Sequence, residues 1–230
     1  MSRVVILGDG LLGKELVNQT NWDNISRKKD GFDITNTSTF DLLLETFDGI
    51  AQKSKYDTII NCIANTNTYS DDREAHWDVN YRGVADLVDF CNKWGVKLVH
   101  ISTDYVYANS LGTPTELDPP SSQSTHYAHT KLLADGYVEL KSDNYLIIRA
   151  THKPTPFPYD KAWVDQLGNF DTVDIIAQGI VKAIQKEVNG ILNIGTEFKS
   201  MYRLAKRTNP NVLPVRNDDV RIPLNTTRGS

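Results

Sequence analysis

Tyr127 and Lys131 lie four residues apart, a spacing at which the two residue types could do acid chemistry together. In a helix this spacing puts both side chains on one face. A free tyrosine has a pKa of about 10 and is a reluctant acid near neutral pH. A nearby ammonium stabilises the phenolate and lowers that pKa, which suits the tyrosine to proton transfer at a carbonyl oxygen. Because Tyr-x-x-x-Lys also occurs often by chance, as a half-buried ring beside a surface cation, the pair needs support from other segments.

Thr103 supplies that support earlier in the chain. It follows an apolar run within the segment Ser102-Thr103-Asp104-Tyr105. In a parallel sheet the end of such a run lies at the carboxyl edge, where ligands bind. A hydroxyl there could hold a carbonyl oxygen beside Tyr127. Thr103, Tyr127 and Lys131 are therefore the predicted catalytic residues.

A glycine-rich segment near the N-terminus has the composition of a phosphate-binding turn. It directly follows the apolar run 4–7 and precedes a stretch with apolar residues at helical spacing. At such a turn glycines let the backbone approach a diphosphate, and the first N–H groups of the helix attract the anion. The alternative is a tight turn that binds nothing, but a strand on one side and a helix on the other favour dinucleotide binding. The residues expected to bind are Gly8, Gly10, Leu11, Leu12 and Gly13.

The segment Ser26-Arg27-Lys28-Lys29 bears on which nicotinamide cofactor is bound. It falls at the end of the second predicted strand. There a carboxylate accepts the ribose 2′-hydroxyl of NAD, or a cation meets the 2′-phosphate of NADP. Three cations and no acid favour NADP. A guanidinium suits a phosphate better than an ammonium does, because it can donate two hydrogen bonds in parallel. The alternative is a solvated turn, with Asp30 and Asp33 serving the ribose or the adenine.

Short β-branched runs alternate with longer stretches of helical period, which is the pattern of a parallel sheet with crossover helices. The helix that precedes Gly95 should stop there, because glycine suits a helix C-terminus. The predicted fold class is α/β, a Rossmann-like doubly wound parallel sheet with a small C-terminal substrate-binding region. We expect strands at 4–7, 24–27, 58–61, 97–102, 145–149 and 191–194, and helices from 11 onward and at 40–50, 77–94, 125–140 and 173–185.

Composition changes after Arg149. Residues 152–159 hold three prolines, and a second polar, proline-containing stretch begins at Asn209. We expect an NADP-binding Rossmann domain at 1–150 and an abbreviated substrate-binding region at 151–230. Within the latter, about 171–195 should return to the Rossmann sheet.

Charge and cysteine content disfavour several other classes of protein. The 230 residues carry a formal net charge of −4 with scattered lysines and arginines, so we expect no nucleic-acid partner and no membrane partner. Two cysteines without Cys-x-x-Cys spacing and five histidines without metal-ligand spacing predict no metal site. The isolated cysteines Cys62 and Cys91 make a reducing cytoplasm the expected location. No stretch has the length of a signal peptide's apolar region or of a membrane span.

These segments together resemble the extended short-chain dehydrogenase/reductase family, and within it the nucleotide-sugar reductase branch typified by dTDP-4-dehydrorhamnose reductase. Ser-Thr-Asp-Tyr-Val-Tyr is the sharpest pointer to that branch. Sugar-nucleotide 4,6-dehydratases of the same fold carry Asp-Glu after the threonine, so Asp104-Tyr105 disfavours dehydration here. The similarity is carried by the glycine segment, Ile60-Asn61-Cys62-Ile63-Ala64, Val79-Asn80, Ile101-Ser102-Thr103-Asp104-Tyr105-Val106-Tyr107 and Tyr127-Ala128-His129-Thr130-Lys131.

The resemblance implies a role for each residue. Thr103 and Tyr127 would contact the ketone oxygen, and Tyr127 would donate the proton. Lys131 would hold the nicotinamide ribose and lower the tyrosine's pKa. The predicted cofactor-binding residues are Gly8, Gly10, Leu11, Leu12, Gly13, Arg27, Lys28, Asp33, Ile34, Cys62, Ala64, Asn80, Tyr127 and Lys131, and the predicted substrate-binding residues include Asp104 and Tyr105. Lys153, Lys161 and Trp163 are further substrate-binding candidates by residue type, to hold a diphosphate and stack a base; the alternative is that these lysines are only solvated.

The implied reaction is NADPH-dependent reduction of the 4-keto group of a nucleotide-linked 6-deoxyhexose, as in dTDP-rhamnose biosynthesis. The partners implied are that nucleotide sugar and a second copy of the chain in a homodimer. Two features depart from the family. Only Asp9 separates Gly8 from Gly10, where the family usually has two residues, and 230 residues is short. Two alternatives stay open: a non-catalytic NADP-binding regulatory subunit of the same fold, and a nucleotide-sugar epimerase that recycles its bound cofactor.

Overall fold

A six-stranded parallel sheet forms the centre of the computed structural model, which describes residues 3–48, 50–108, 110, 112–121, 125–216 and 221–226. The strand order is β12-β7-β6-β5-β1-β2. From β1 the chain first adds β2 on one side and then crosses to β5 on the other, so the order reverses between β1 and β5. Ligands of doubly wound sheets bind at such a reversal. The strands are β1 (Val4–Leu7), β2 (Asp23–Ile25), β5 (Thr58–Asn61), β6 (Lys97–Ile101), β7 (Tyr145–Arg149) and β12 (Gly190–Asn193).

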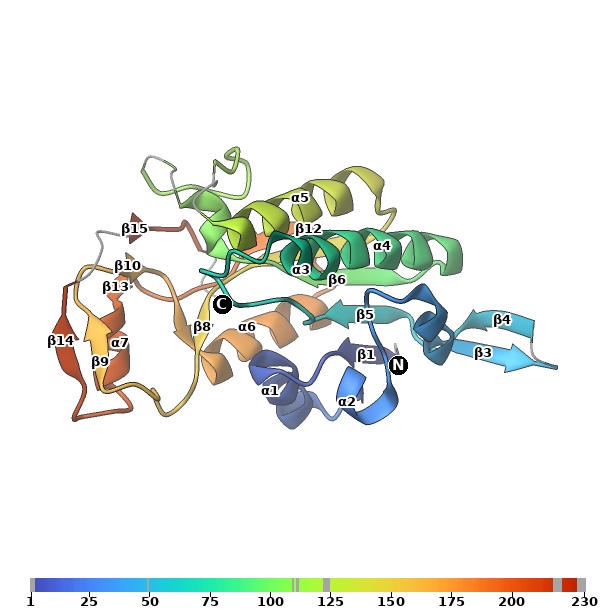
Figure 1. Ribbon diagram of the computed structural model, residues 1–230, viewed down its shortest axis with the longest axis horizontal. Helices are drawn as coiled ribbons and strands as arrows, with labels where there is room; N and C mark the ends of the chain where they lie inside the picture. The colour runs from blue at the N-terminus through green and yellow to red at the C-terminus, as the bar shows by residue number, and fades with distance from the viewer. Residues whose placement is uncertain are drawn as a thin grey trace.

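Helices cover both faces of this sheet (Figure 1). On one face α1 (Leu11–Thr20) lies against α6 (Val173–Gln185). On the other face α4 (Gly83–Trp94) packs beside α5 (His126–Lys141), and α3 (Arg73–Trp77) leads into α4 through a π-helical turn at Asp78–Arg82. The predicted fold class, a Rossmann-like α/β sheet, is confirmed.

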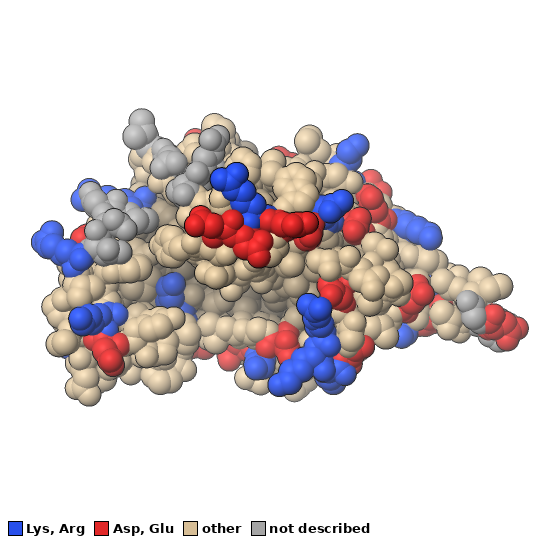
Figure 2. Space-filling model, viewed as in Figure 1, with Lys and Arg blue, Asp and Glu red and all other residues tan. Residues whose placement is uncertain are grey.

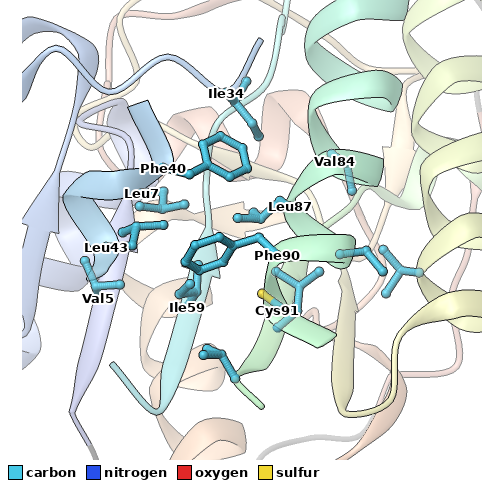
Figure 3. Packing of buried hydrophobic residues seen from close by; sticks show 14 of the residues in the cluster. Val5, Leu7, Ile34, Phe40, Leu43, Ile59, Val84, Leu87, Phe90 and Cys91 are labelled. Atoms are coloured by element: carbon cyan, nitrogen blue, oxygen red, sulfur yellow. The ribbon is translucent and has the colours of Figure 1, made fainter. Parts of the chain in front are cut away.

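Successive side chains of β1 point to opposite faces, so this short strand packs against helices on both sides of the sheet. Val5 and Leu7 pack in the cluster formed with α4, whereas Val4 and Ile6 pack in the cluster formed with α1 and α6. Successive side chains of a strand point to opposite faces, so a continuous apolar run is what a doubly covered strand requires. Figure 3 shows the first cluster, in which Phe40 and Phe90 close the space beside Leu7.

Residues that follow β7 build a smaller unit at one end of the molecule. Its described residues form a three-stranded sheet (β13-β10-β15), two two-stranded sheets (β11-β8 and β14-β9) and a short helix, and Figure 1 shows it beyond the carboxyl ends of the central strands. Between these pieces the chain returns to the sheet through α6 and β12. The elements are β8 (His152–Lys153), β9 (Lys161–Trp163), β10 (Leu167–Gly168), β11 (Asp171–Thr172), β13 (Lys199–Ser200), α7 (Met201–Lys206), β14 (Leu213–Val215) and β15 (Arg221–Ile222).

The helix expected at 40–50 is wrong. A 3₁₀ helix spans Thr37–Leu43 and is followed by an antiparallel hairpin of β3 (Leu44–Phe47) and β4 (Ile50–Ser54). The Asp-Gly dipeptide at 48–49 is the reason, because it favours a tight hairpin turn, and Asp48 adopts a φ of 50°. Glu45 and Lys53 face each other across the hairpin with a 3.2 Å ion pair.

The second strand also ends earlier than expected. It stops at Ile25, and Arg27 begins a short helix, α2 (Arg27–Asp30), capped by the Ser26 side chain, which accepts a hydrogen bond from the Lys29 backbone N–H. A serine followed by polar residues favours such a cap over strand continuation. No helix in the described part of the chain is long and apolar enough to cross a membrane.

Candidate active site

The turn between β1 and α1 has the geometry of a diphosphate cradle. Gly8 has a φ of 99°, which side chains other than glycine rarely adopt. A Cβ on Gly13 would lie 2.2 Å from the Gly8 carbonyl oxygen, so α1 packs closely on the turn. A Cβ on Gly10 would meet nothing within 4 Å, and no side chain caps the start of α1. The first N–H groups of the helix, at Leu11 and Leu12, are therefore available to an anion, and the residues present fit a dinucleotide.

Arg27 and Lys28 lie on α2, beyond the end of β2. Arg27 is exposed, and its guanidinium lies 3.3 Å from the Asp33 carboxylate. A hydrogen bond from the Thr35 backbone lowers the pKa of Asp33, with a smaller effect of the Arg27 charge, so Asp33 is an anion at neutral pH. Figure 2 shows lysines and arginines gathered over α2, below a hollow that lies at the carboxyl edge of the sheet. Ile34 is buried against Gly83.

The side chain of Asn80 holds the loop after β5 in place through hydrogen bonds. The Asn80 side chain is fully buried and accepts a 2.8 Å hydrogen bond from the backbone N–H of Asn65. Its amide nitrogen donates to the Asn65 carbonyl at 3.1 Å and to the Thr130 hydroxyl at 3.4 Å. Asn80 thus connects the loop that contains Cys62 and Ala64 to helix α5, and its own contacts are inside the protein.

Thr103 and Tyr127 are brought together at the carboxyl edge of the sheet. Thr103 follows β6, and its hydroxyl accepts a 3.2 Å hydrogen bond from the Tyr105 backbone N–H. Tyr127 lies in the first turn of α5, and its ring packs edge-to-face on Tyr105, with centroids 6.5 Å apart. Burial raises the pKa of Tyr127 to about 12, and a hydrogen bond between the Tyr127 and Thr103 side chains opposes that rise.

Lys131 lies below this pair, and its side chain is 1% exposed. Its ammonium donates a 2.7 Å hydrogen bond to the Ile101 carbonyl and lies 3.1 Å from Nε2 of His100. Burial lowers the pKa of Lys131 to about 8, although the charge of Asp135 opposes this.

The expected lowering of the Tyr127 pKa by Lys131 is not found. The groups that act on the phenol, after burial, are Thr103, which lowers the pKa, and Asp104 and Asp135, which raise it. The ammonium is directed to the strand carbonyl and to His100 instead. The phenol therefore keeps its proton at neutral pH in the protein alone.

Asp104 is buried beside Thr103, and the charge of the half-buried Lys153 acts on it. Asp104 is 2% exposed and accepts hydrogen bonds from the hydroxyls of Thr151 and, at 3.4 Å, of Thr103. Burial raises the pKa of Asp104, whereas Thr151 and the charge of Lys153 lower it. Burial lowers the pKa of Lys153, and the charge of Asp104 opposes this. Lys153 therefore belongs to the group around Tyr127.

Lys161 and Trp163 are not part of this group. They lie in β9, which pairs with β14 in the smaller unit, and Lys161 is exposed. No hydrogen bond or ring contact joins either residue to Tyr127 within the described residues. Tyr105 instead reaches the smaller unit through Gln166, whose side-chain amide donates a 3.2 Å hydrogen bond to the Tyr105 hydroxyl.

Four polar residues at the site were missed by the sequence interpretation: His100, Asp135, Thr151 and Gln166. Two of them carried a signal. His100 interrupts an otherwise apolar strand, and Asp135 stands four residues after Lys131 on the same helix face. Thr151 and Gln166 carried none, because their contacts depend on how the chain after β7 folds back.

A family model described as the RmlD substrate binding domain matches residues 2–152. A dTDP-4-dehydrorhamnose reductase of Mycolicibacterium smegmatis is 36% identical over 95 residues. That alignment covers 40% of this chain and 29% of the length of the relative.

Solved structures match over almost the whole chain. The dTDP-4-dehydrorhamnose reductase from Bacillus anthracis, crystallised with NADP, superposes with a TM-score of 0.80 at 24% identity, covering 97% of this chain and 89% of that one. The enzyme of that name from Clostridium acetobutylicum gives 0.78 at 23% identity, with coverages of 98% and 90%. The UDP-glucuronic acid 4-epimerase from Bacillus cereus, in complex with NAD, gives 0.74 at 16% identity, with coverages of 99% and 88%. At these identities the likeness establishes a shared fold.

Proposed function

Because the chain belongs to the RmlD substrate binding domain family, we propose that it is an NADPH-dependent reductase of a nucleotide-linked 4-keto-6-deoxyhexose. The observation that carries the proposal is the pairing of the Thr103 hydroxyl with the protonated Tyr127 phenol at the carboxyl edge of the sheet. The uncapped glycine turn lies at the same edge, at the strand-order reversal. A carbonyl binder, an acid and a dinucleotide cradle at one edge are what carbonyl reduction needs.

NADPH is the proposed cofactor. Its diphosphate would lie on the N–H groups at the start of α1, and its 2′-phosphate would face Arg27 and Lys28. The loop with Cys62 and Ala64, held by Asn80, would line the path to the nicotinamide. When bound, NADPH supplies the hydride. The neighbouring reductase from Bacillus anthracis was crystallised with NADP, which supports this choice.

The residues of the chain then supply the proton. A ketone oxygen between Thr103 and Tyr127 would accept hydrogen bonds from both hydroxyls. As the carbonyl becomes an alkoxide, Tyr127 gives its proton to that oxygen. A phenol pKa of about 12 suits this direction, because the acid is fully protonated at neutral pH and an alkoxide is a stronger base than a phenolate. Lys131, whose ammonium is bonded to Ile101 and His100, would use its remaining N–H to hold the nicotinamide ribose.

The sugar would lie on the side of Tyr127 that faces the smaller unit. Asp104, Tyr105 and Lys153 are the proposed contacts there, and Gln166 orients the Tyr105 hydroxyl. We further propose that 151–230 is the substrate-binding region of the protein, with α6 and β12 as its returning part. Lys161 and Trp163 would have a role only toward the more distant nucleotide, since β9 lies away from the Tyr127 group.

The direct test is the oxidation of NADPH by the purified chain in the presence of dTDP-, UDP- and GDP-linked 4-keto-6-deoxyhexoses. We expect stoichiometric NADPH loss with at least one of them and a 6-deoxyhexose product in that nucleotide form. A protein that converts the sugar without net consumption of NADPH would instead be an epimerase. A protein that binds NADPH, turns over none of the sugars and co-purifies with another enzyme would be a regulatory subunit.

Replacing Arg27 with serine tests the cofactor preference. We expect the ratio of kcat/KM for NADPH to that for NADH to fall about 10- to 100-fold, because one charge-assisted hydrogen bond to the 2′-phosphate is lost. Steady-state kinetics with both cofactors give this ratio. Arg3→Ser is the matched control, since Arg3 also pairs with a carboxylate, Glu45 at 2.8 Å, but precedes β1 at the opposite edge of the sheet. An unchanged ratio in Arg27→Ser would refute the role of Arg27.

A further inference from the structure

The ammonium of Lys131 is held by groups that the reaction itself does not require. Two hydrogen-bond positions are occupied, by the carbonyl of Ile101 at 2.7 Å and by Nε2 of His100 at 3.1 Å. An ammonium has three N–H donors and no acceptor. With two donors directed into the protein, the third has no hydrogen-bond acceptor among the described residues.

His100 is fully buried on β6, and its surroundings fix its protonation. Burial and the charge of Lys131 keep the pKa of the imidazole well below its usual range, so the ring is neutral. An ammonium can only donate, so Nε2 must accept and the ring proton must lie on Nδ1. Nδ1 has no hydrogen-bond partner among the described residues, so this tautomer leaves a buried donor unsatisfied. An unsatisfied buried donor costs stability, which is a reason to look for a function.

The imidazole of His100 lies close both to Lys131 and to a buried ion pair of Asp135 and Arg149. Nε2 of His100 lies 3.8 Å from Oδ1 of Asp135, and Oδ2 of Asp135 accepts a 3.0 Å hydrogen bond from the Arg149 guanidinium. Arg149 in turn donates to the Tyr107 hydroxyl at 2.5 Å. Asp135 and Arg149 are at most 2% exposed. An anion and a cation thus lie in fixed order behind the lysine, with the carboxylate nearer to it.

We propose that His100 and Asp135 are positioning residues for Lys131. His100 fixes where the ammonium lies, and Asp135 keeps it charged in a site that excludes water. Arg149 holds Asp135 in turn. The ionisable groups around the lysine are Cys62 after β5, His100 on β6, and Tyr127 and Asp135 on its own helix. The inference rests on the proposed reductase function, in which Lys131 takes part.

Nitrogen-15 NMR of the imidazole rings tests the arrangement without any substrate. At pH 6.5 we expect His100, assigned by its loss in His100→Gln, to show a protonated Nδ1 and an unprotonated Nε2. A protonated Nε2 at this pH would overturn the proposal, because that nitrogen could not then accept from the ammonium. This result does not depend on turnover, so it stands even if every sugar fails as a substrate.

Three variants test what the positioning does for the rate. His100→Leu removes the acceptor, and we expect kcat to fall about tenfold, the effect of one hydrogen bond to a charged group. His100→Gln keeps an acceptor near the same place and should recover most of that loss, whereas equal losses in the two variants would refute the positioning role. Asp135→Asn should move the alkaline limb of the kcat profile, set by Lys131 near pH 8, to lower pH by about one unit.

Two further proteins separate this effect from general destabilisation. Asp135→Asn leaves Arg149 without its partner, so the double variant Asp135→Asn/Arg149→Met is measured beside it and should show the same shift of the limb. Asp171→Asn is the matched control. Asp171 is a buried carboxylate whose ion pairs, to Lys199 at 3.3 Å and to Arg207, lie in the smaller unit. It should lose stability while its alkaline limb stays in place. An unmoved limb in both Asp135 proteins would overturn the role of Asp135.

Discussion

Tyr127→Phe is expected to lower kcat for the 4-keto sugar by about 10²- to 10⁴-fold, the contribution of a positioned general acid. The phenylalanine keeps the ring that packs edge-to-face on Tyr105 and lies 6.3 Å from the His76 ring, so the fold of the site should persist. Only the hydroxyl that bonds with Thr103 is lost. Single-turnover measurement of NADPH oxidation at saturating sugar isolates the chemical step from cofactor binding, which should change little.

Tyr137→Phe is the control for this substitution. Tyr137 lies on the same helix, and its hydroxyl donates a 3.3 Å hydrogen bond to Asp89, away from the sheet edge. Its rate should match that of the unmodified protein. If Tyr127→Phe kept the full rate while Tyr137→Phe did the same, Tyr127 would not be the acid, and Asp104 would be the next candidate because burial raises its pKa.

The sequence indicated the arrangement of the candidate site better than its electrostatics. Segment order along the chain indicated that the glycine turn, Thr103 and Tyr127 meet at one sheet edge, because parallel strands end on the same side. The family resemblance made from these segments is confirmed by the family match over residues 2–152. The effect of Lys131 on Tyr127 was not predictable, since it depends on which partner the ammonium selects. The ammonium bonds with a carbonyl and an imidazole on β6.

The apolar pattern gave a wrong secondary-structure prediction where a turn interrupts it. Residues 40–50 have apolar residues that fit a helical period, yet the Asp-Gly dipeptide turns the chain back into β4. The period of a short apolar stretch does not distinguish helix from strand, and the turn residues decide. In the chain after β7 the difficulty is of another kind. Gln166 and Thr151 reach the site through contacts between distant segments, and residue type alone gives no sign of such contacts.

Gly13→Ala is expected to have the largest effect on cofactor binding. Its Cβ would lie 2.2 Å from the carbonyl oxygen of Gly8, and neither backbone can move without shifting α1 away from β1. We expect the free energy of unfolding to fall by about 1–3 kcal/mol, the usual cost of overpacking. The Kd for NADPH should rise at least about 10- to 100-fold, because a helix N–H no longer reaches the diphosphate and each such charged hydrogen bond contributes about 1.5–3 kcal/mol. Calorimetric titration and denaturant unfolding measure the two quantities.

Two other glycines turn this prediction into a test of the cradle itself. Gly136→Ala, in the middle of α5 with open space around its Cβ, should raise stability by about 0.5–1 kcal/mol and leave NADPH binding unchanged. Gly10→Ala also has room for its Cβ, and its φ of −68° suits alanine, so stability should hold. Its new methyl group would occupy the space over the start of α1, where the diphosphate is expected. Weakened NADPH binding by a fully stable Gly10→Ala protein would therefore locate the cofactor on this turn, whereas unimpaired binding would mean that the glycines serve only to pack α1 against β1.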